Sequence, residues 1–325
     1  MVKVIRIHKT GGPEVLTFED AEVGDPPAGQ VRLRQTAIGL NYADVYQRSG
    51  MVPLPSFPSG LGSEAAGMVE AIGPNVTEVK VGQRVAYAGA PIGGYAEKRF
   101  YPANRLIPLP DSIDDVTAAS MMMQGMTAEY LIRRCYPVKK GDTILVHAAA
   151  GGVGSIMCQW AKHLGATVIG TVGSDEKAKV AKANGVDHPI VYTREKFLDR
   201  VKEITGGKGV PVVYDSIGKD TWEGSLDCLS PRGLMVSFGN ASGPVPPFAP
   251  GILSAKGSLY VTRPQLGSYV ITRDDLLACA QALFDVVQNG AVKVGAKQRY
   301  AFKDVAQAHK DMESRKTTGS SVLIP

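Results

Sequence analysis

The chain has 325 residues, of which 44% are hydrophobic and 21% charged, so it is long enough to bury one large core or two ordinary ones. Its net charge of +5 comes from 36 basic and 31 acidic residues with no block of like charge, which argues against a nucleic-acid-binding tail. The 4 cysteines form no CxxC pair, and there is neither a signal-peptide core nor a long apolar run, so we expect a cytoplasmic protein without disulfides or membrane insertion.

Residues 1–125 are typical of an irregular, mostly β domain. Short alternating runs such as "QVRLRQTAIG" and "AAGMVEAIG" are separated by Gly and Pro, as in strands joined by turns. The run "MMMQG" at 121–125 is expected to fill the core, because Met commonly fills irregular gaps.

Residues 126–255 predict an α/β fold with a doubly wound parallel sheet. Apolar runs such as "TILVHAA", "TVIGTV" and "VPVVYDSI" alternate with helical patterns such as "SIMCQWAKHLG" and "REKFLDRVKEITGG". Buried strands that alternate with amphipathic helices form right-handed βαβ units.

Residues 256–325 contain one long helical pattern, "RDDLLACAQALFDVVQNG", and end on the strand-like "SSVLIP". We expect this tail to return to the first domain, because the central segment already accounts for a complete nucleotide fold. The Pro-rich stretch "SGPVPPFAP" at 242–250 is either a linker or the lip of a pocket.

A glycine-rich turn follows "TILVHAA" and has the order Ala149-Ala150-Gly151-Gly152-Val153-Gly154, with Ser155 expected to begin a helix. Gly151 and Gly152 allow the backbone to approach a pyrophosphate, and Gly154 lets the helix pack on the strand. Ala149 stands where a GxGxxG motif has its first glycine, which is acceptable if that residue keeps a negative φ. The strand before the turn and the helix after it predict a dinucleotide site.

The end of the next strand favours NADPH over NADH. Val172, Gly173 and Ser174 occupy the place where NAD-binding sites carry an acidic residue. Lys177 follows in the next helix, and Ser174 can add a donor to an anion. In the alternative interpretation Lys177 is a solvated lysine and Asp175 or Glu176 takes the acidic role, although Asp175 suits a helix N-cap better.

Several further motifs occur in order along the chain: "NYADVYQRSG" at 41–50, "GSEAAGMVEAIGPNV" at 62–76, "GGYAE" at 93–97 and "QGMTAEYL" at 124–131. With "HAAAGGVG" and "SSVLIP", they resemble the NADPH:quinone oxidoreductase (zeta-crystallin-like) branch of the medium-chain dehydrogenase/reductase superfamily. The resemblance implies a GroES-like catalytic domain from residues 1–125 and 256–325, a Rossmann NADPH-binding domain at 126–255, a cleft for the nicotinamide, and usually a homodimer.

The resemblance also bears on zinc. Alcohol dehydrogenases of this superfamily hold catalytic zinc with a Cys, a His before a Glu, and a second Cys. The matching positions here are Asn41, Ser63 before Glu64, and the region of Met123 and Gln124, and the Cys-rich lobe for structural zinc is missing. We therefore expect no metal.

A quinone is a reasonable acceptor without metal, because it takes a hydride readily and its product oxyanion is phenol-like, with a pKa of about 10 by analogy with tyrosine. The protein would mainly hold the nicotinamide C4 against the acceptor. By resemblance, Asn41 lies beside the nicotinamide. Tyr46 is the predicted donor to the acceptor oxygen, unless it only packs in the cleft.

The resemblance assigns further cofactor contacts. Thr127 and Tyr130 are expected near the nicotinamide and diphosphate, and Tyr192 near the adenosine phosphate unless it is structural. Arg263 is expected either to orient the nicotinamide or to hold the cleft. The remaining matched positions are Phe238, Gly239 and Arg315, whose guanidinium could pair with a phosphate.

Three functions follow: reduction of quinones, which we favour; reduction of activated C=C bonds in enones or alkenals; and a non-enzymatic role as a crystallin or an AU-rich RNA-binding protein. The last is not favoured, because the sequence shows no basic, aromatic-rich face.

Overall fold

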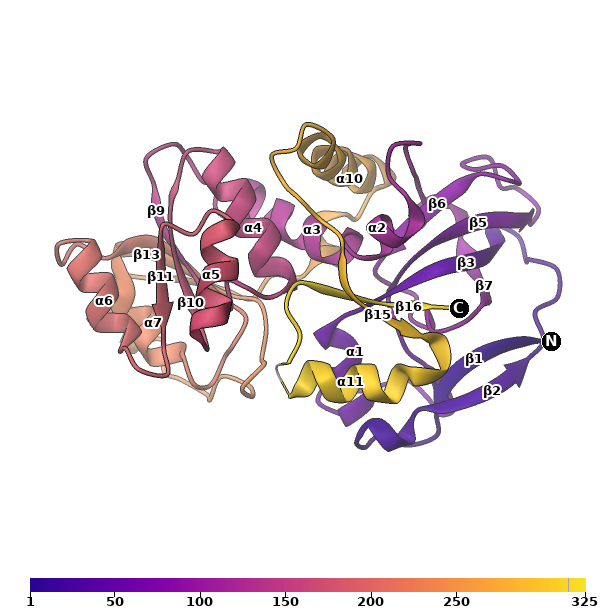
Figure 1. Ribbon diagram of the computed structural model, residues 1–325, viewed down its shortest axis with the longest axis horizontal. Coiled ribbons are helices and arrows are strands. Elements are labelled where there is room, and N and C mark those ends of the chain that lie inside the picture. The colour runs from indigo at the N-terminus through magenta and orange to yellow at the C-terminus, as the bar shows by residue number, and fades with distance from the viewer. Residues whose placement is uncertain (315) are drawn as a thin grey trace. The chain divides into compact units, whose positions relative to one another are not determined.

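The chain folds into two compact units in the computed structural model, which describes residues 1–314 and 316–325 (Figure 1). Unit 1 comprises Met1–Met126, Val270–Gln281 and Val294–Pro325, and unit 2 comprises Thr127–Tyr269 and Ala282–Lys293. Both ends of the chain therefore belong to unit 1. Among the described residues, no helix has the length and apolar character needed to cross a membrane.

Unit 1 is built mainly from antiparallel strands. A sheet of 7 strands has the order β15-β16-β3-β5-β6-β8, with β7 paired to β3, and a sheet of 3 strands has the order β2-β1-β4. In β3 the alternation seen in the sequence buries Val31, Leu33 and Gln35 and leaves the residues between them less buried. The strand bounds are β1 Val2–Ile7, β2 Thr17–Ala21, β3 Gln30–Leu40, β4 Ser59–Gly60, β5 Glu64–Ile72, β6 Arg84–Ala88, β7 Lys98–Pro102, β8 Ile107–Pro108, β15 Ala296–Ala301 and β16 Ser320–Ile324.

The helices of unit 1 contribute buried side chains to its core. Met121 and Met122, around the start of α3, are fully buried, which confirms the packing role expected of the methionine run. Helix α10 is shared, because Val270–Gln281 clusters with unit 1 and Ala282–Lys293 with unit 2. The helices are α1 Tyr42–Ser49, α2 Asp115–Ala119, α3 Met122–Tyr130, which runs on into unit 2, α10 Arg273–Gln288 and α11 Val305–Glu313, with short 3-10 turns at Pro13–Val15, Ala103–Arg105 and Phe302–Asp304.

Unit 2 is a doubly wound parallel sheet, as predicted. Its 6 strands have the order β11-β10-β9-β12-β13-β14, and every pair is parallel. Figure 1 shows α4 and α5 on one side of the sheet and α6 and α7 on the other. The bounds are β9 Thr143–Val146, α4 Gly152–His163, β10 Thr167–Val172, α5 Asp175–Ala183, β11 His188–Val191, α6 Phe197–Ile204, β12 Val210–Asp215, α7 Trp222–Cys228, β13 Leu229–Ser237, α8 Gly251–Ala255, β14 Tyr260–Thr262 and α9 Leu266–Tyr269, with a π-helical turn at Leu131–Cys135.

The return to unit 1 comes later than the expected residue 256. Strand β14, Tyr260–Thr262, still pairs with β13 at the edge of the unit 2 sheet, and the change of unit follows Tyr269. The three-residue strand is too short to produce a clear sequence pattern, which explains the difference.

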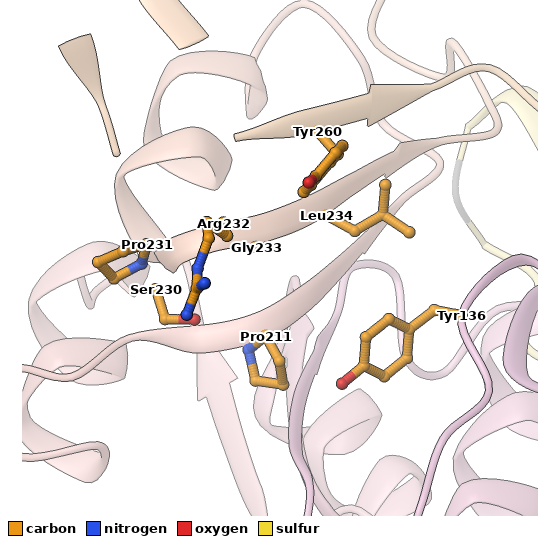
Figure 2. Close-up of a pocket in the computed structure, with 8 residues that line it drawn as sticks. All are labelled: Tyr136, Pro211, Ser230, Pro231, Arg232, Gly233, Leu234 and Tyr260. Carbon is orange, nitrogen blue, oxygen red and sulfur yellow. The ribbon is translucent and has the colours of Figure 1, made fainter. Parts of the chain in front are cut away.

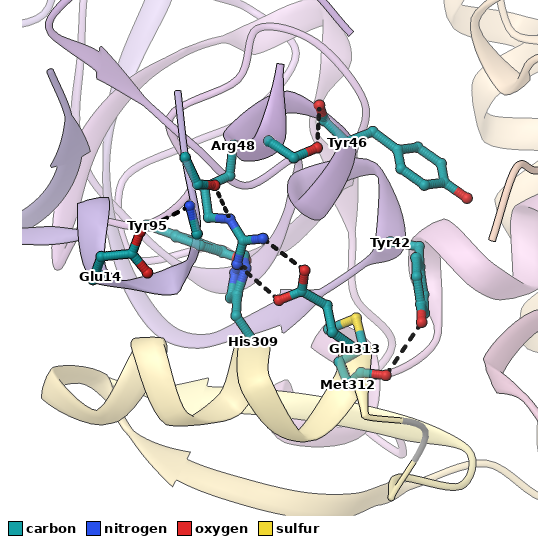
Figure 3. A network of polar contacts seen from close by, with 11 residues as sticks. Glu14, Tyr42, Tyr46, Arg48, Tyr95, His309, Met312 and Glu313 are labelled. Carbon is teal, nitrogen blue, oxygen red and sulfur yellow. Dashed lines mark hydrogen bonds and ion pairs between the residues drawn. The ribbon is translucent and has the colours of Figure 1, made fainter. Parts of the chain in front are cut away.

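An ion pair between the buried Arg48 and the partly exposed Glu313 ties α1 to α11 within unit 1 (Figure 3). The Arg48 side chain is 2% exposed and donates to both carboxylate oxygens of Glu313, at 2.9 and 2.7 Å. The Tyr95 hydroxyl lies 2.9 Å from Asp44 Oδ2 and 3.0 Å from Nε2 of His309. Burial and the charge of Arg48 lower the pKa of His309 to about 3, so the imidazole is neutral at pH 7.

We predict that Glu313→Gln lowers the free energy of unfolding by about 1–3 kcal/mol, because a buried guanidinium loses its charged partner. Urea unfolding measures the change. Asp20→Asn is the control, because the Lys3–Asp20 pair is exposed and its loss should cost no more than about 0.5 kcal/mol. Equal losses in the two variants would contradict this role of the Arg48–Glu313 pair.

Candidate functional site

The glycine-rich turn brings α4 close to the end of β9. Helix α4 begins at Gly152 with Gly151 as N-cap, three residues before the expected start at Ser155. A Cβ on Gly154 would lie 2.3 Å from the carbonyl oxygen of Ala148, which confirms the close packing expected of that glycine. The left-handed backbone conformation falls on Ala148, at φ 52°, so Ala149 is tolerated where the motif usually has glycine.

This turn can hold an anion. The first N–H groups of a helix have no partner within the helix, so the amides of Gly152, Val153 and Gly154 are available to a phosphate, and the helix dipole favours its charge. The residues therefore fit a dinucleotide pyrophosphate.

Buried polar side chains hold the strand ends around the turn. His147, the first residue after β9, lies 2.9 Å from Thr171 Oγ1 and 3.0 Å from Ser225 Oγ, and the Ser225 hydroxyl donates to the Asp215 carboxylate at 2.9 Å. Burial lowers the pKa of His147, with the charge of Asp215 acting in the opposite direction. These contacts join β9, β10 and β12 beside the predicted pyrophosphate site.

The predicted 2′-phosphate residues gather at the ends of β10 and β11. A Cβ on Gly173 would lie 2.8 Å from the hydroxyl of Tyr192, and Ser174 Oγ accepts from the backbone N–H of Lys177 at 3.3 Å. Ser174 is therefore the N-cap of α5, and the prediction that Asp175 has this role is wrong. Ser174 has an extended backbone just before the helix, so its short side chain can reach the N–H of the third helical residue, Lys177. Asp175 is already the first helical residue and therefore cannot be the N-cap.

Asp175 is instead paired with a neighbouring cation. Its carboxylate lies 2.6 Å from the Arg194 guanidinium, which lowers the carboxyl pKa through a hydrogen bond and its charge. An acidic group already paired in this way is poorly placed to take the ribose-binding role. Arg194 lies two residues after Tyr192. No sequence motif marks this arginine, so its contact with Asp175 could not be predicted.

Arg263 holds the turn after β13. Its guanidinium donates to the carbonyl oxygens of Ser237 at 3.1 Å and Gly239 at 2.9 Å. A Cβ on Gly239 would lie 2.5 Å from the Ser216 carbonyl oxygen, and the backbone N–H of Phe238 donates to the backbone carbonyl oxygen of Asp215. Through these contacts, which lie within unit 2, Arg263 stabilises the turn that follows β13.

The other residues assigned by resemblance differ in their surroundings. Tyr130 is 2% exposed and stacks on Tyr269 at 4.5 Å between ring centroids, so its ring contributes packing. Thr127 is half-buried. Arg315 lies outside the described residues.

A second polar cluster lies in unit 1 around Glu64. The carboxyl group is fully buried and accepts from Nδ2 of Asn41 at 2.7 Å and from the backbone N–H of Met123 at 2.8 Å. Asn41 Oδ1 lies 3.5 Å from Nε2 of Gln124, which accepts at Oε1 from the Ser320 hydroxyl at 2.5 Å. Burial raises the pKa of Glu64 to about 8, although the bonds from Asn41 and Met123 lower it.

Tyr46 stands on α1, which begins directly after Asn41. It is half-buried, and its ring lies 5.9 Å from that of Tyr42. Figure 3 shows the Tyr46 ring directed away from the Arg48 and His309 cluster. The structure thus places Tyr46 within two helical turns of Asn41.

The positions that match zinc ligands come together in this cluster. Asn41, Glu64, Met123 and Gln124 are joined by hydrogen bonds, and Ser63 is buried with an unpartnered hydroxyl. Within residues 1–314 and 316–325, no three His, Cys, Asp or Glu side chains are grouped so that they could hold a metal ion. The donor set therefore does not fit a catalytic zinc ion.

A separate open pocket lies on unit 2 (Figure 2) and contains none of the predicted site residues. It uses the amino-terminal parts of β12 and β13, whereas the glycine-rich turn follows the carboxyl end of β9. Since parallel strands end at the same edge, the pocket is not part of the nucleotide site. It is lined by Tyr136, Pro211, Ser230, Pro231, Arg232, Gly233, Leu234 and Tyr260.

Comparison with known proteins agrees with this architecture. The family described as "Alcohol dehydrogenase GroES-like domain" matches residues 27–111, and the family described as "Zinc-binding dehydrogenase" matches residues 152–283. A quinone oxidoreductase of Pseudomonas aeruginosa is 54% identical over 325 residues, with 100% of each chain covered. The chain belongs to the quinone oxidoreductases of the medium-chain dehydrogenase/reductase superfamily.

Other quinone oxidoreductases and one relative with a different name are also similar. The crystal structure of Escherichia coli quinone oxidoreductase complexed with NADPH has a TM-score of 0.98 and 49% identity, over 99% of this chain and 100% of that one. A 2-haloacrylate reductase of Burkholderia sp is 48% identical, over 100% of this chain and 99% of that protein. The fold is therefore that of the quinone oxidoreductases throughout the chain.

We predict that the stability advantage of the wild type over Glu64→Gln shrinks between about pH 5 and pH 8. The folded state keeps the Glu64 proton up to a pKa of about 8, whereas the unfolded state loses it near the ordinary value of 4.5. The folded state thus binds more protons in this window, and its free energy of unfolding falls as the pH rises. Urea unfolding of both proteins at the two pH values measures this, and a constant difference would refute it.

Proposed function

We propose that this quinone oxidoreductase uses NADPH to reduce quinones and that it works without a metal ion. The observation that carries the proposal is the glycine-rich turn at the start of α4 together with Gly173 and Ser174 after β10 and Lys177 in α5. The NADPH complex of the Escherichia coli protein supports the choice of cofactor. The hydrogen-bonded amide and carboxyl groups at the zinc positions support a metal-free reaction.

In this proposal, successive segments of unit 2 bind successive parts of the cofactor. Gly152, Val153 and Gly154 hold the pyrophosphate with backbone amides, and Gly151 lets the backbone approach it. Gly173, Ser174, Lys177 and Tyr192 surround the 2′-phosphate, and Arg194 adds a second cation there. Phe238, Gly239, Thr127 and Tyr130 lie toward the diphosphate and nicotinamide, with the turn at Gly239 kept in place by Arg263, and we propose that Arg315 pairs with a phosphate.

The residues of unit 1 act on the reacting groups. When bound, NADPH supplies a hydride from C4 of its nicotinamide. Asn41 orients the reactants with its side-chain amide, and the Tyr46 hydroxyl donates a hydrogen bond to the acceptor oxygen. Little acid catalysis is needed, because the product oxyanion is phenol-like, with a pKa of about 10, so these residues chiefly position the acceptor and exclude water.

One observation favours a second substrate class. The relative named 2-haloacrylate reductase is 48% identical over the whole chain, so reduction of an activated C=C bond is the alternative. The same cofactor and the same positioning residues would serve it.

We also propose that the enzyme is a cytoplasmic homodimer. Strand β14 is an edge strand of the unit 2 sheet, and Tyr260 on it is 62% exposed, which leaves an edge suited to pairing with a second copy. The four cysteines, all within the described residues, are thiols outside any disulfide, which suits a reducing compartment.

We predict that the purified enzyme oxidises NADPH with a simple quinone, and that its kcat/KM is at least about tenfold lower with an enone or 2-haloacrylate. The reason is that the residues proposed here position the reactants and offer no strong acid. Loss of NADPH absorbance measures both reactions, with a chelator present in a parallel series. A preference for the C=C acceptor, or loss of activity with the chelator, would overturn the assignment.

We predict that Lys177→Ala weakens NADPH binding about tenfold or more while NADH binding stays nearly the same, because a charged hydrogen bond to the 2′-phosphate is worth roughly 1.5–3 kcal/mol. Isothermal titration calorimetry measures both affinities. Lys179→Ala, an exposed lysine on the same helix, is the matched control. Equal losses for NADPH and NADH would remove Lys177 from the phosphate site.

A further inference from the structure

The carboxyl group of Glu64 is placed to act on one neighbouring side chain. Its Oε2 accepts from Nδ2 of Asn41 at 2.7 Å, and its Oε1 accepts from the Met123 N–H at 2.8 Å. The residue is fully buried. Glu64 therefore offers no free oxygen to a bound reactant, and any effect on the reaction must pass through its partners.

Packing fixes where this carboxyl group lies. A Cβ on Gly39, in the neighbouring strand β3, would lie 2.3 Å from Glu64 Oε2 and 2.3 Å from the carbonyl oxygen of Ala119. No side chain fits at residue 39 unless one of these oxygens moves. The space beside the carboxyl group is thus filled by backbone, and the acceptor keeps a fixed position.

Glu64 also decides which way the Asn41 amide faces. With Nδ2 toward Glu64, Oδ1 faces the Nε2 donor of Gln124 at 3.5 Å. A turn of the amide by 180° would set its nitrogen against the nitrogen of Gln124 and would turn its donor away from Glu64 Oε2, so both of these contacts would be lost. The shorter bond, to a carboxyl group without exposure to water, contributes most of this preference.

We propose that Glu64 is a positioning residue for Asn41: it fixes the plane and direction of the side-chain amide, so that the second Nδ2 hydrogen is aimed constantly at the reactants. This inference rests on the proposed function, in which Asn41 touches the reacting groups. Since an amide is planar, holding one N–H fixes the direction of the other. Ser320 and Gln124 support the opposite end of the amide.

A double-mutant cycle tests the proposal with the full-length enzyme, NADPH and a simple quinone. Glu64→Gln keeps the size of the side chain but presents an NH2 group, which cannot accept, to one of the two donors. In the enzyme that retains Asn41, we expect Glu64→Gln to lower kcat about tenfold. In the Asn41→Ala variant, the same substitution should lower kcat less than about twofold, and the Kd for NADPH should change less than about twofold in both backgrounds. Equal losses of kcat in both backgrounds would overturn the proposal, because Glu64 would then act independently of Asn41.

Two comparisons keep the result clear. Glu64→Asp retains a carboxyl group but withdraws it from Asn41, so the same cycle is run with it, and its loss of kcat should likewise disappear in the Asn41→Ala background. The melting temperature of each variant shows whether it is folded. If the wild type fails to oxidise NADPH with a quinone, the proposed function fails; if it is active and the losses are additive, only the role of Glu64 fails.

Discussion

The close approach of α4 to the end of β9 is the constraint on which the nucleotide site depends. The approach is possible because residue 154 has no side chain, since a Cβ there would lie 2.3 Å from the Ala148 carbonyl oxygen. It brings the amino-terminal amides of α4 to the point where the strand order reverses, between β9 and β12, which is where doubly wound sheets bind nucleotides. The buried bonds of His147 and Asp215 hold the neighbouring strand ends at this point.

In the proposed function, unit 1 meets a different requirement, which is to hold the Asn41 amide in position without a metal ion. A zinc ion would order its ligands through coordination bonds. In this chain the same positions are ordered by hydrogen bonds among Asn41, Glu64 and Gln124 and by the backbone around Gly39. Such a cluster is suited to positioning rather than to stabilising an alkoxide, and this agrees with an acceptor whose reduced form is only weakly basic.

Regular patterns made much of the fold predictable. The alternation of apolar strands and amphipathic helices identifies the six-stranded sheet of unit 2, and the glycines at 151–154 identify the turn, because both depend on local sequence. The start of α4 at Gly152, the cap at Ser174 and the late strand at Tyr260–Thr262 were not predicted correctly, since differences of about one to three residues in where an element begins or ends leave little trace in sequence. The partnership of Glu64 with Asn41 and that of Arg194 with Asp175 join residues far apart in the chain, and no local pattern reports such contacts.

The central claim is that a phosphorylated dinucleotide binds at the turn before α4, with its reactive end at a metal-free amide. A crystal structure of the enzyme soaked with NADPH tests it most directly. The account predicts the pyrophosphate on the amides of Gly152–Gly154, the 2′-phosphate beside Ser174 and Lys177, the nicotinamide against Asn41, and no metal density near Glu64. A 2′-phosphate that points into solvent, or a metal ion bound at Asn41 and Glu64, would contradict it.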